Sequence, residues 1–212
     1  MSAGSDKNAT SELNTGNSLQ DIFWIGGVTC SGKSSVARAL GERFALSVYE
    51  TDATFDTHAR MAQEAYHPTM FKYQNDDDWL AGIRMLNPKA KVKVWLEFYR
   101  ERFGMIVKDL LGINSRPIVA EGVDLLPEMV MSRTTPDRSV WLVPSRRLFD
   151  KVYFTRPWVT EEPSEGVWSY YSFMIDHIRL ATQSQGYPVI EVSDPESIEQ
   201  VAESLAMRFG LE

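Results

Sequence analysis

The sequence predicts a three-layer α/β fold, in which a five-stranded parallel β-sheet lies between two layers of helices. Short apolar runs alternate along the chain with helical stretches, and each run ends in turn or helix-capping residues. Strands joined through helices pair in parallel, so this alternation indicates a sheet whose crossover helices cover both faces. The five runs are residues 22–25, 46–49, 117–120, 139–143 and 188–192.

The length and composition fit one domain preceded by a tail. Hydrophobic residues make up 43% of the 212 residues, which is enough apolar material for a core. We expect residues 21–212 to form this single domain. Residues 1–20 are rich in Ser, Asn, Gly and Thr and cannot bury enough surface to offset the entropy of ordering. They are predicted to be disordered.

The charge and the cysteine content exclude several classes of function. The net charge of −7 repels phosphodiester backbones, so no nucleic-acid partner is expected. The single cysteine, Cys30, excludes an internal disulfide and a cysteine-rich zinc site, and the three histidines lack metal-binding spacing. No apolar run is long enough to cross a membrane, and the first residues lack the apolar core of a signal peptide. A cytoplasmic location without membrane contact is therefore expected.

The interval between the second and third strands is too long for one crossover. It contains helical stretches at about residues 53–66, 76–86 and 88–111. The last of these carries an apolar stripe at helical spacing, which favours packing against the core. We interpret residues 53–112 as a helical insertion that is well placed to cover a substrate.

Residues 27–34 match the phosphate-binding pattern GxxxxGK(S/T) without departure. Glycines allow the main chain to approach a phosphate closely, and successive N–H groups at a helix N-terminus form an anion-binding nest. In this pattern the lysine reaches the β- and γ-phosphates, and the Ser or Thr hydroxyl binds Mg²⁺. The motif follows an apolar strand and opens an amphipathic helix, as this chemistry requires. We therefore predict an ATP and Mg²⁺ site formed by Gly27, Val28, Thr29, Cys30, Ser31, Gly32, Lys33, Ser34 and Ser35.

Cys30 lies inside this loop. A small, tolerated side chain is the favoured interpretation. The weaker hypothesis is that the loop lowers the pKa of the thiol and makes it reactive.

Carboxylates follow two of the predicted strands, where ligands bind in a parallel sheet. Asp52 is predicted to act on the acceptor side, receiving the proton of the acceptor hydroxyl, with a helix N-cap as the alternative. Glu121 is predicted to act in catalysis, beside the substrate and on the magnesium side. Glu50 is the other candidate metal ligand alongside Ser34, with a structural role equally favoured.

With these motifs, the chain resembles the small P-loop kinases, namely the shikimate, gluconate and nucleoside monophosphate kinase group. The resemblance covers roughly residues 21–210 and is carried by GGVTCSGKS at 26–34 and by the acidic pair of Glu50 and Asp52. The segments TDATFDTHAR at 51–60 and VAEGVDLLP at 119–127 are similar to segments of 2-phosphoglycerate kinase. The resemblance implies the strand order 2-3-1-4-5, a lid and a helical acceptor-binding region. Shikimate kinases have a glycine cluster after the third strand, and its absence here argues against shikimate.

Arginines after the fourth strand are candidates for stabilising the charge of the transferred phosphoryl group. Residues 155–166 contain two prolines and few core residues, and we interpret them as a mobile lid. Arg156 followed by Pro157 resembles the lid segment of shikimate kinases, which makes Arg156 the preferred catalytic arginine. Arg60 is a candidate for holding an anionic acceptor, with a surface role equally favoured.

The sequence therefore predicts ATP- and Mg²⁺-dependent phosphorylation of a small metabolite. A nucleoside or nucleoside monophosphate kinase is the first alternative. The second is a nucleotide-binding regulator without turnover. A GTPase switch ranks below these because no NKxD guanine-specificity motif is present. The acceptor and the oligomeric state stay open.

Overall fold

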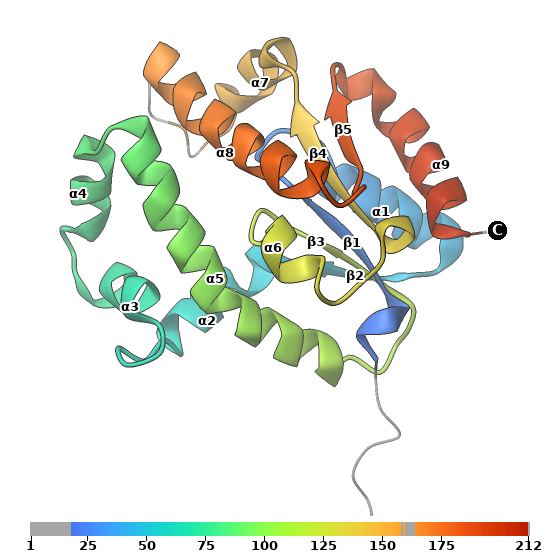
Figure 1. Ribbon diagram of the computed structural model, residues 1–212, viewed down its shortest axis with the longest axis horizontal. Helices are drawn as coiled ribbons and strands as arrows, with labels where there is room; N and C mark the ends of the chain where they lie inside the picture. Colours follow the sequence, from blue (N-terminus) through green and yellow to red (C-terminus); the bar gives the residue numbers. More distant parts are fainter. Residues whose placement is uncertain (1–17, 158, 160–163, 212) are drawn as a thin grey trace, which may run out of the picture.

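A computed structural model describes residues 18–157, 159 and 164–211, so residues 1–17 of the expected tail lie outside the described chain (Figure 1). The five strands form one sheet in the order β2-β3-β1-β4-β5, and every neighbouring pair is parallel. This confirms the predicted fold class and strand order. The strands are β1 Ile22–Gly27, β2 Ser47–Glu50, β3 Ile118–Glu121, β4 Ser139–Pro144 and β5 Val189–Val192.

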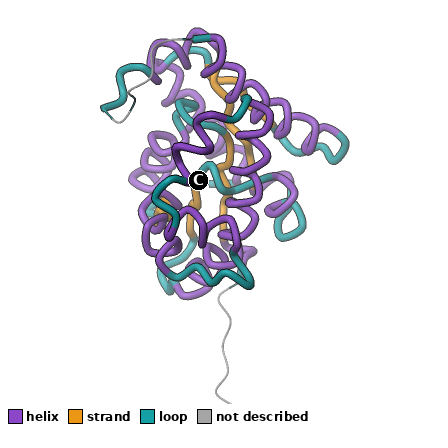
Figure 2. The backbone as a smooth tube through the Cα atoms, turned by 90° about the vertical axis from the view of Figure 1, so that its left-hand side faces the viewer, coloured by secondary structure: helices purple, strands orange, loops and turns teal. Residues whose placement is uncertain are grey.

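Helices cover both faces of the sheet (Figures 1 and 2). One face packs against α1 Lys33–Phe44 and α9 Ile198–Phe209. The other packs against α5 Pro88–Gly112, α6 Pro127–Val130 and α8 Glu165–Gln183. Helix α7, Arg146–Tyr153, follows β4.

Strand β1 shows how the sequence specifies these two layers. Its side chains alternate between the faces of the sheet, as the period of a strand requires. Ile22 and Trp24 are buried in the cluster formed with α5 and α8. Phe23 and Ile25 are buried in the cluster formed with α1 and α9. An apolar run without alternation therefore marks a strand that is buried on both faces.

The helical insertion lies between β2 and β3, and its first part differs from the prediction. The 3₁₀ helix η2, Thr51–Thr54, leads into α2, Phe55–Arg60, which ends six residues before the predicted boundary. A separate helix, α3 Pro68–Asn75, was not predicted. Proline suits the first position of a helix because its ring presets φ and no N–H is needed there, so Pro68 begins a new helix. The insertion continues with α4 Trp79–Met85 and then α5.

Residues 18–20 also differ from the prediction, because they do not behave as part of a tail. Leu19–Asp21 form the 3₁₀ helix η1, and Leu19 packs against the core. The carbonyl oxygen of Ser18 accepts a 2.7 Å hydrogen bond from Nη1 of Arg116. The remaining short helices are η3 Pro136–Arg138 and η4 Pro195–Ser197.

Candidate functional site

The loop between β1 and α1 has a backbone that its residue types make possible. Gly27 has φ of 128°, and a Cβ atom there would lie 1.9 Å from the carbonyl oxygen of Leu142 on β4. Gly32 has φ of 83° and stands at the N-cap of α1. Side chains are strongly disfavoured at both positions, so the two glycines of the motif hold the loop against the sheet and turn it into the helix.

The first helical hydrogen bond of α1 runs from the N–H of Val36 to the carbonyl oxygen of Gly32 at 3.0 Å. The N–H groups at the three preceding positions therefore have no acceptor within the helix. These positions are Lys33, Ser34 and Ser35. Together with the positive end of the helix dipole, they fit the oxygens of a phosphate chain.

Lys33 is held inside the loop. It exposes 7% of its surface, and its Nζ donates to the carbonyl oxygen of Val28 across 2.8 Å. Burial lowers the pKa of Lys33, while the carboxylates of Glu121 and Asp52 oppose this shift. The charges of two predicted carboxylates therefore act directly on the loop lysine.

Glu121 ends β3 beside the loop and exposes only 3% of its surface. In the sheet it lies opposite Ile25 of β1 and opposite Glu50 of β2. Burial raises the pKa of Glu121, while the ammonium of Lys33 and the nearby hydroxyl of Ser34 oppose the increase. The structure thus brings Lys33, Ser34 and Glu121 together, as the sequence predicts.

Asp52 lies in η2, directly after β2, and its side chain is exposed. Its charge acts on both Lys33 and Glu121. The alternative role as a helix N-cap is not observed, because the N-cap of α2 is Thr54. Among the described residues, no hydrogen bond or ion pair engages the carboxylate of Asp52, whose charge acts on the loop lysine.

Glu50 has a partner on the neighbouring helix. Its Oε1 lies 2.8 Å from Nε of Arg38 on α1, and the side chain of Glu50 is 30% exposed. This ion pair is the kind of structural contact that the sequence left open as an alternative. The role of Glu50 as a metal ligand stays a prediction.

The two remaining predicted arginines differ in their positions. Arg156 lies close to the thiol of Cys30 in the loop. Arg60 ends α2, is exposed, and donates to the hydroxyl of Thr57 at 3.4 Å. Within the described ranges, no hydrogen bond or ion pair links Arg60 to Lys33, Asp52 or Glu121. The structure therefore brings Arg156, but not Arg60, to the candidate site.

Part of the expected lid lies outside the described residues, namely 158 and 160–163. Its last two residues, 165 and 166, belong to α8.

Burial raises the pKa of Cys30, although Arg156 and Lys33 oppose the shift. The hypothesis that the loop activates this thiol by lowering its pKa is therefore wrong, since desolvation of the thiolate outweighs the two cations.

Sequence reasoning missed a buried polar network behind Asp52. Arg102 of α5 is fully buried and donates to the carboxylate of Asp124 and to the carbonyl oxygen of Thr51. Its Nε also donates to Nδ1 of His58 across 3.2 Å. The signal was present in the sequence, because position 102 continues the apolar stripe of α5 at helical spacing. A charged residue in such a stripe needs buried partners.

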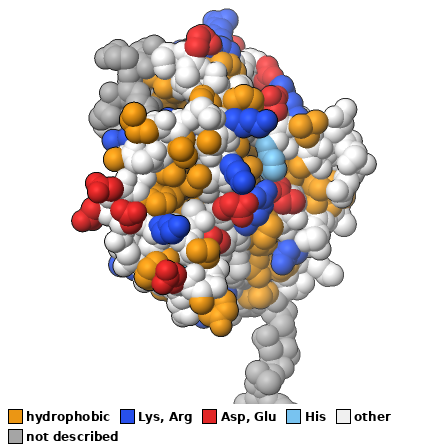
Figure 3. Space-filling view, turned by 60° about the vertical axis from the view of Figure 1, so that its left-hand side comes forward, with side chains coloured by type: hydrophobic (Ala, Val, Ile, Leu, Met, Phe, Trp, Pro, Cys, Tyr) orange, Lys and Arg blue, Asp and Glu red, His pale blue; other side chains and the backbone are white. Residues whose placement is uncertain are grey.

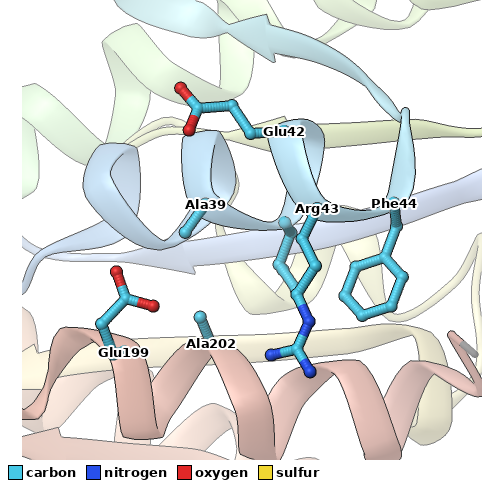
Figure 4. Close-up of a pocket in the computed structure, with 7 residues that line it drawn as sticks. Ala39, Glu42, Arg43, Phe44, Glu199 and Ala202 are labelled. Carbon is cyan, nitrogen blue, oxygen red and sulfur yellow. The ribbon is translucent and has the colours of Figure 1, made fainter.

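A cavity of about 870 Å³ opens beside the loop and reaches from Thr29 to the helical insertion and α8. A smaller cavity of about 340 Å³ lies between α1 and α9 and is shown in Figure 4. Glu42, Arg43 and Glu199 are among its lining residues, and none of the predicted site residues lines it. We assign only the larger cavity to the candidate site.

The described residues contain no group of three or more His, Cys, Asp or Glu side chains that could hold a metal ion by themselves. Mg²⁺ usually binds through one or two carboxylates, water and substrate phosphates, so it does not need such a group. Ser34 and Glu121, adjacent to the loop, fit this type of binding. Over the same part of the chain, no helix has both the length and the apolar character needed to cross a lipid bilayer.

The sequence matches no protein-family model, and the comparison with curated proteins finds no match. Among solved structures, the protein TT1252 from Thermus thermophilus is similar over 89% of this chain and 97% of its own, with a TM-score of 0.51 and 16% identity. The chain has the P-loop nucleoside-triphosphatase fold. The decisive observations are the strand order, the loop backbone and this overall likeness, which at such identity concerns the fold alone.

Two further solved structures are similar at a lower level. A thymidylate kinase from Candida albicans has a TM-score of 0.48 at 14% identity, over 89% of this chain and 90% of that one. A gluconokinase from Sinorhizobium meliloti 1021 has a TM-score of 0.44 at 16% identity, over 91% of this chain and 92% of that one. These weaker likenesses carry no argument about activity.

Proposed function

We propose that the protein is an ATP- and Mg²⁺-dependent phosphotransferase that phosphorylates a hydroxyl group of a small molecule. The observation that carries the proposal is the buried Lys33 in a phosphate-binding loop, with Glu121 and Asp52 acting on it from two strand ends. A loop that only turned the chain would not need a buried lysine beside two carboxylates.

The N–H groups at the start of α1 bind the phosphate oxygens, and Lys33 exchanges its contact with the Val28 carbonyl for the β- and γ-phosphates. Ser34 and Glu121, the latter through water, would hold Mg²⁺, which would supply charge neutralisation on the phosphates. Arg156, close to the loop at Cys30, stabilises the charge that builds up on the transferred group.

Asp52 is the group on the acceptor side. The acceptor oxygen forms a bond to the γ-phosphorus, and the bond from that phosphorus to the β,γ-bridging oxygen breaks, so ADP leaves. The hydroxyl proton passes to the carboxylate of Asp52. The exposure of Asp52 leaves its carboxylate accessible to an incoming hydroxyl.

The experiment combines calorimetry of Mg–ATP binding with ADP release in the presence of acceptor sets. The sets are hydroxy acids, sugar acids, nucleosides and nucleoside monophosphates. We expect Mg–ATP to bind and one set to accelerate ADP release. Acceleration by the last two sets would favour a nucleoside or nucleotide kinase. Absence of binding would refute the nucleotide site, and binding without turnover on every set would favour a regulator.

A further inference from the structure

The cavity beside the loop has the position and size of a small-molecule site. Its volume of about 870 Å³ lies within the usual range for ligand pockets. It is lined by Thr29 of the phosphate loop and by residues of α4, α5, α7 and α8. These elements are far apart in the sequence, and only the packing of the insertion against α8 brings them together (Figure 1).

Aromatic side chains form much of the wall of this cavity. Trp95 and Tyr99 come from α5, and their ring centroids are 5.9 Å apart with planes 31° from parallel. Tyr170 and Tyr171 come from α8, with centroids 4.8 Å apart. Rings of this kind bind a flat apolar group by offset or edge contacts.

Among the described residues, the charged groups of the lining are all positive. Arg84 of α4 and Lys91 of α5 line the cavity, and no carboxylate of a described residue does, although the chain carries a net charge of −7. Within the described part of the chain, no ion pair joins Arg84 or Lys91 to an acidic residue. Figure 3 shows this side of the molecule, where apolar side chains lie among both basic and acidic ones. Two cations without an ion-pair partner among the described residues, set beside apolar walls, fit an anionic group on the ligand.

The inner end of the cavity reaches the reacting groups. Thr29 of the phosphate loop and Tyr99 of α5 both line the cavity, so it opens onto the loop itself. A molecule in the cavity can therefore present one end to the loop while its other end contacts the cations.

We propose that this cavity binds the phosphate acceptor, and that the acceptor is an aromatic acid bearing a hydroxyl group. Its ring packs against Trp95 and the tyrosines of α8, its anionic group pairs with Arg84 and Lys91, and its hydroxyl faces the phosphate loop. The assignment of this ligand as an acceptor rests on the proposed function. The binding preference itself rests only on the walls of the cavity.

The test is binding without nucleotide, measured by thermal shift and then by calorimetry. Three matched sets are compared at equal concentration: hydroxylated aromatic acids, their neutral alcohol counterparts, and aliphatic hydroxy acids without a ring. We expect the ligands to come from the first set, with affinities about tenfold above those of either counterpart. Absence of binders in the first set, or equal affinity across all sets, would overturn the proposal.

The cations are tested in Arg84→Ala and Lys91→Ala, each compared with Lys89→Ala, which removes an exposed lysine of α5 outside the cavity. We expect each lining variant to lower the affinity of the best aromatic acid about tenfold, and Lys89→Ala to leave it unchanged. An equal loss in Lys89→Ala would overturn the assignment. Since no ATP is present, this failure would leave the proposed phosphotransfer standing, whereas absence of Mg–ATP binding would refute phosphotransfer and leave the cavity preference intact.

Discussion

Nε of Arg102 donates to Nδ1 of His58 across 3.2 Å, and both side chains are buried. Because Nδ1 accepts this bond, the ring proton lies on Nε2, which donates to Oδ2 of Asp109 at 2.9 Å. The imidazole is therefore neutral and held in one tautomer. Arg102 also donates to the carbonyl oxygen of Thr51, the residue before Asp52. The network thus ties the carboxylate of the candidate site to the insertion.

Replacing Arg102 tests how much this network contributes to stability. In Arg102→Met the carboxylate of Asp124 stays buried without its cation, so we expect a loss of about 3–5 kcal/mol in the free energy of unfolding. Arg100→Met is the control, because Arg100 pairs with Glu97 and Glu128 near the surface and is expected to contribute under about 1 kcal/mol. Urea denaturation measures both. Equal losses in the free energy of unfolding would show that the buried pair contributes no more to stability than the surface pairs.

The pH dependence of stability should reveal His58. Burial and the charge of Arg102 lower the pKa of His58 below its ordinary value of 6.5, and Asp109 opposes the shift. The unfolded chain then binds more protons in this pH range, so stability rises with pH. The stability contributed by the neutral His58 is complete above about pH 6.5 and is lost as the pH falls through the folded-state pKa. We expect wild-type stability to fall more steeply than that of His58→Gln between pH 7 and 5. Parallel curves would contradict this.

Lys33→Ala tests the phosphate loop. We expect turnover to fall about a thousandfold or more, because in the proposed mechanism Lys33 supplies the cation to the β- and γ-phosphates. Far-ultraviolet circular dichroism should be unchanged, since the helix and strands around the loop keep their packing. Arg43→Ala removes an exposed cation from the same helix and should retain turnover. Wild-type turnover in Lys33→Ala would remove the lysine from the mechanism.

Asp52→Asn separates catalysis from nucleotide binding. Losing the proton acceptor should lower kcat about 10²–10⁴-fold while the dissociation constant of Mg–ATP changes by less than about threefold. Asp56→Asn, at an exposed acidic position in the first turn of α2, is the matched control and should keep kcat. Steady-state kinetics measures kcat, and calorimetry measures the dissociation constant of Mg–ATP. A comparable loss in both would indicate a structural role for Asp52.

Two glycine-to-alanine changes should act in opposite directions. In Gly27→Ala the new Cβ meets the carbonyl oxygen of Leu142 at 1.9 Å and forces a side chain to φ of 128°, so we expect a loss of about 2 kcal/mol or more. Gly104 lies within α5 with no atom within 4 Å of a Cβ, so Gly104→Ala should gain about 0.5–1 kcal/mol from helix propensity. Thermal unfolding measures both, and a stable Gly27→Ala would contradict the close approach of the loop to β4.

The sequence was sufficient for the sheet and the phosphate loop. The five strands lie where the apolar runs are, each within two residues of the predicted ends, because each strand is a short segment bounded by its own turn residues. The loop is a contiguous segment whose backbone depends on Gly27 and Gly32 themselves. Properties of this kind are local, so the order of residues is enough to predict them.

The contact of Ser18 with Arg116 and the pair of Glu50 with Arg38 were decided by packing. The network of Arg102 joins residues 22 to 51 positions apart, and the cavity takes its walls from the loop and four helices. These contacts, the network and the cavity all depend on groups that meet only after the chain has folded. The sequence alone therefore determined the fold and the loop proposed to bind phosphate, because both are set by contiguous segments, and the tertiary structure decided what surrounds Asp52 and which side chains line the cavity beside the loop.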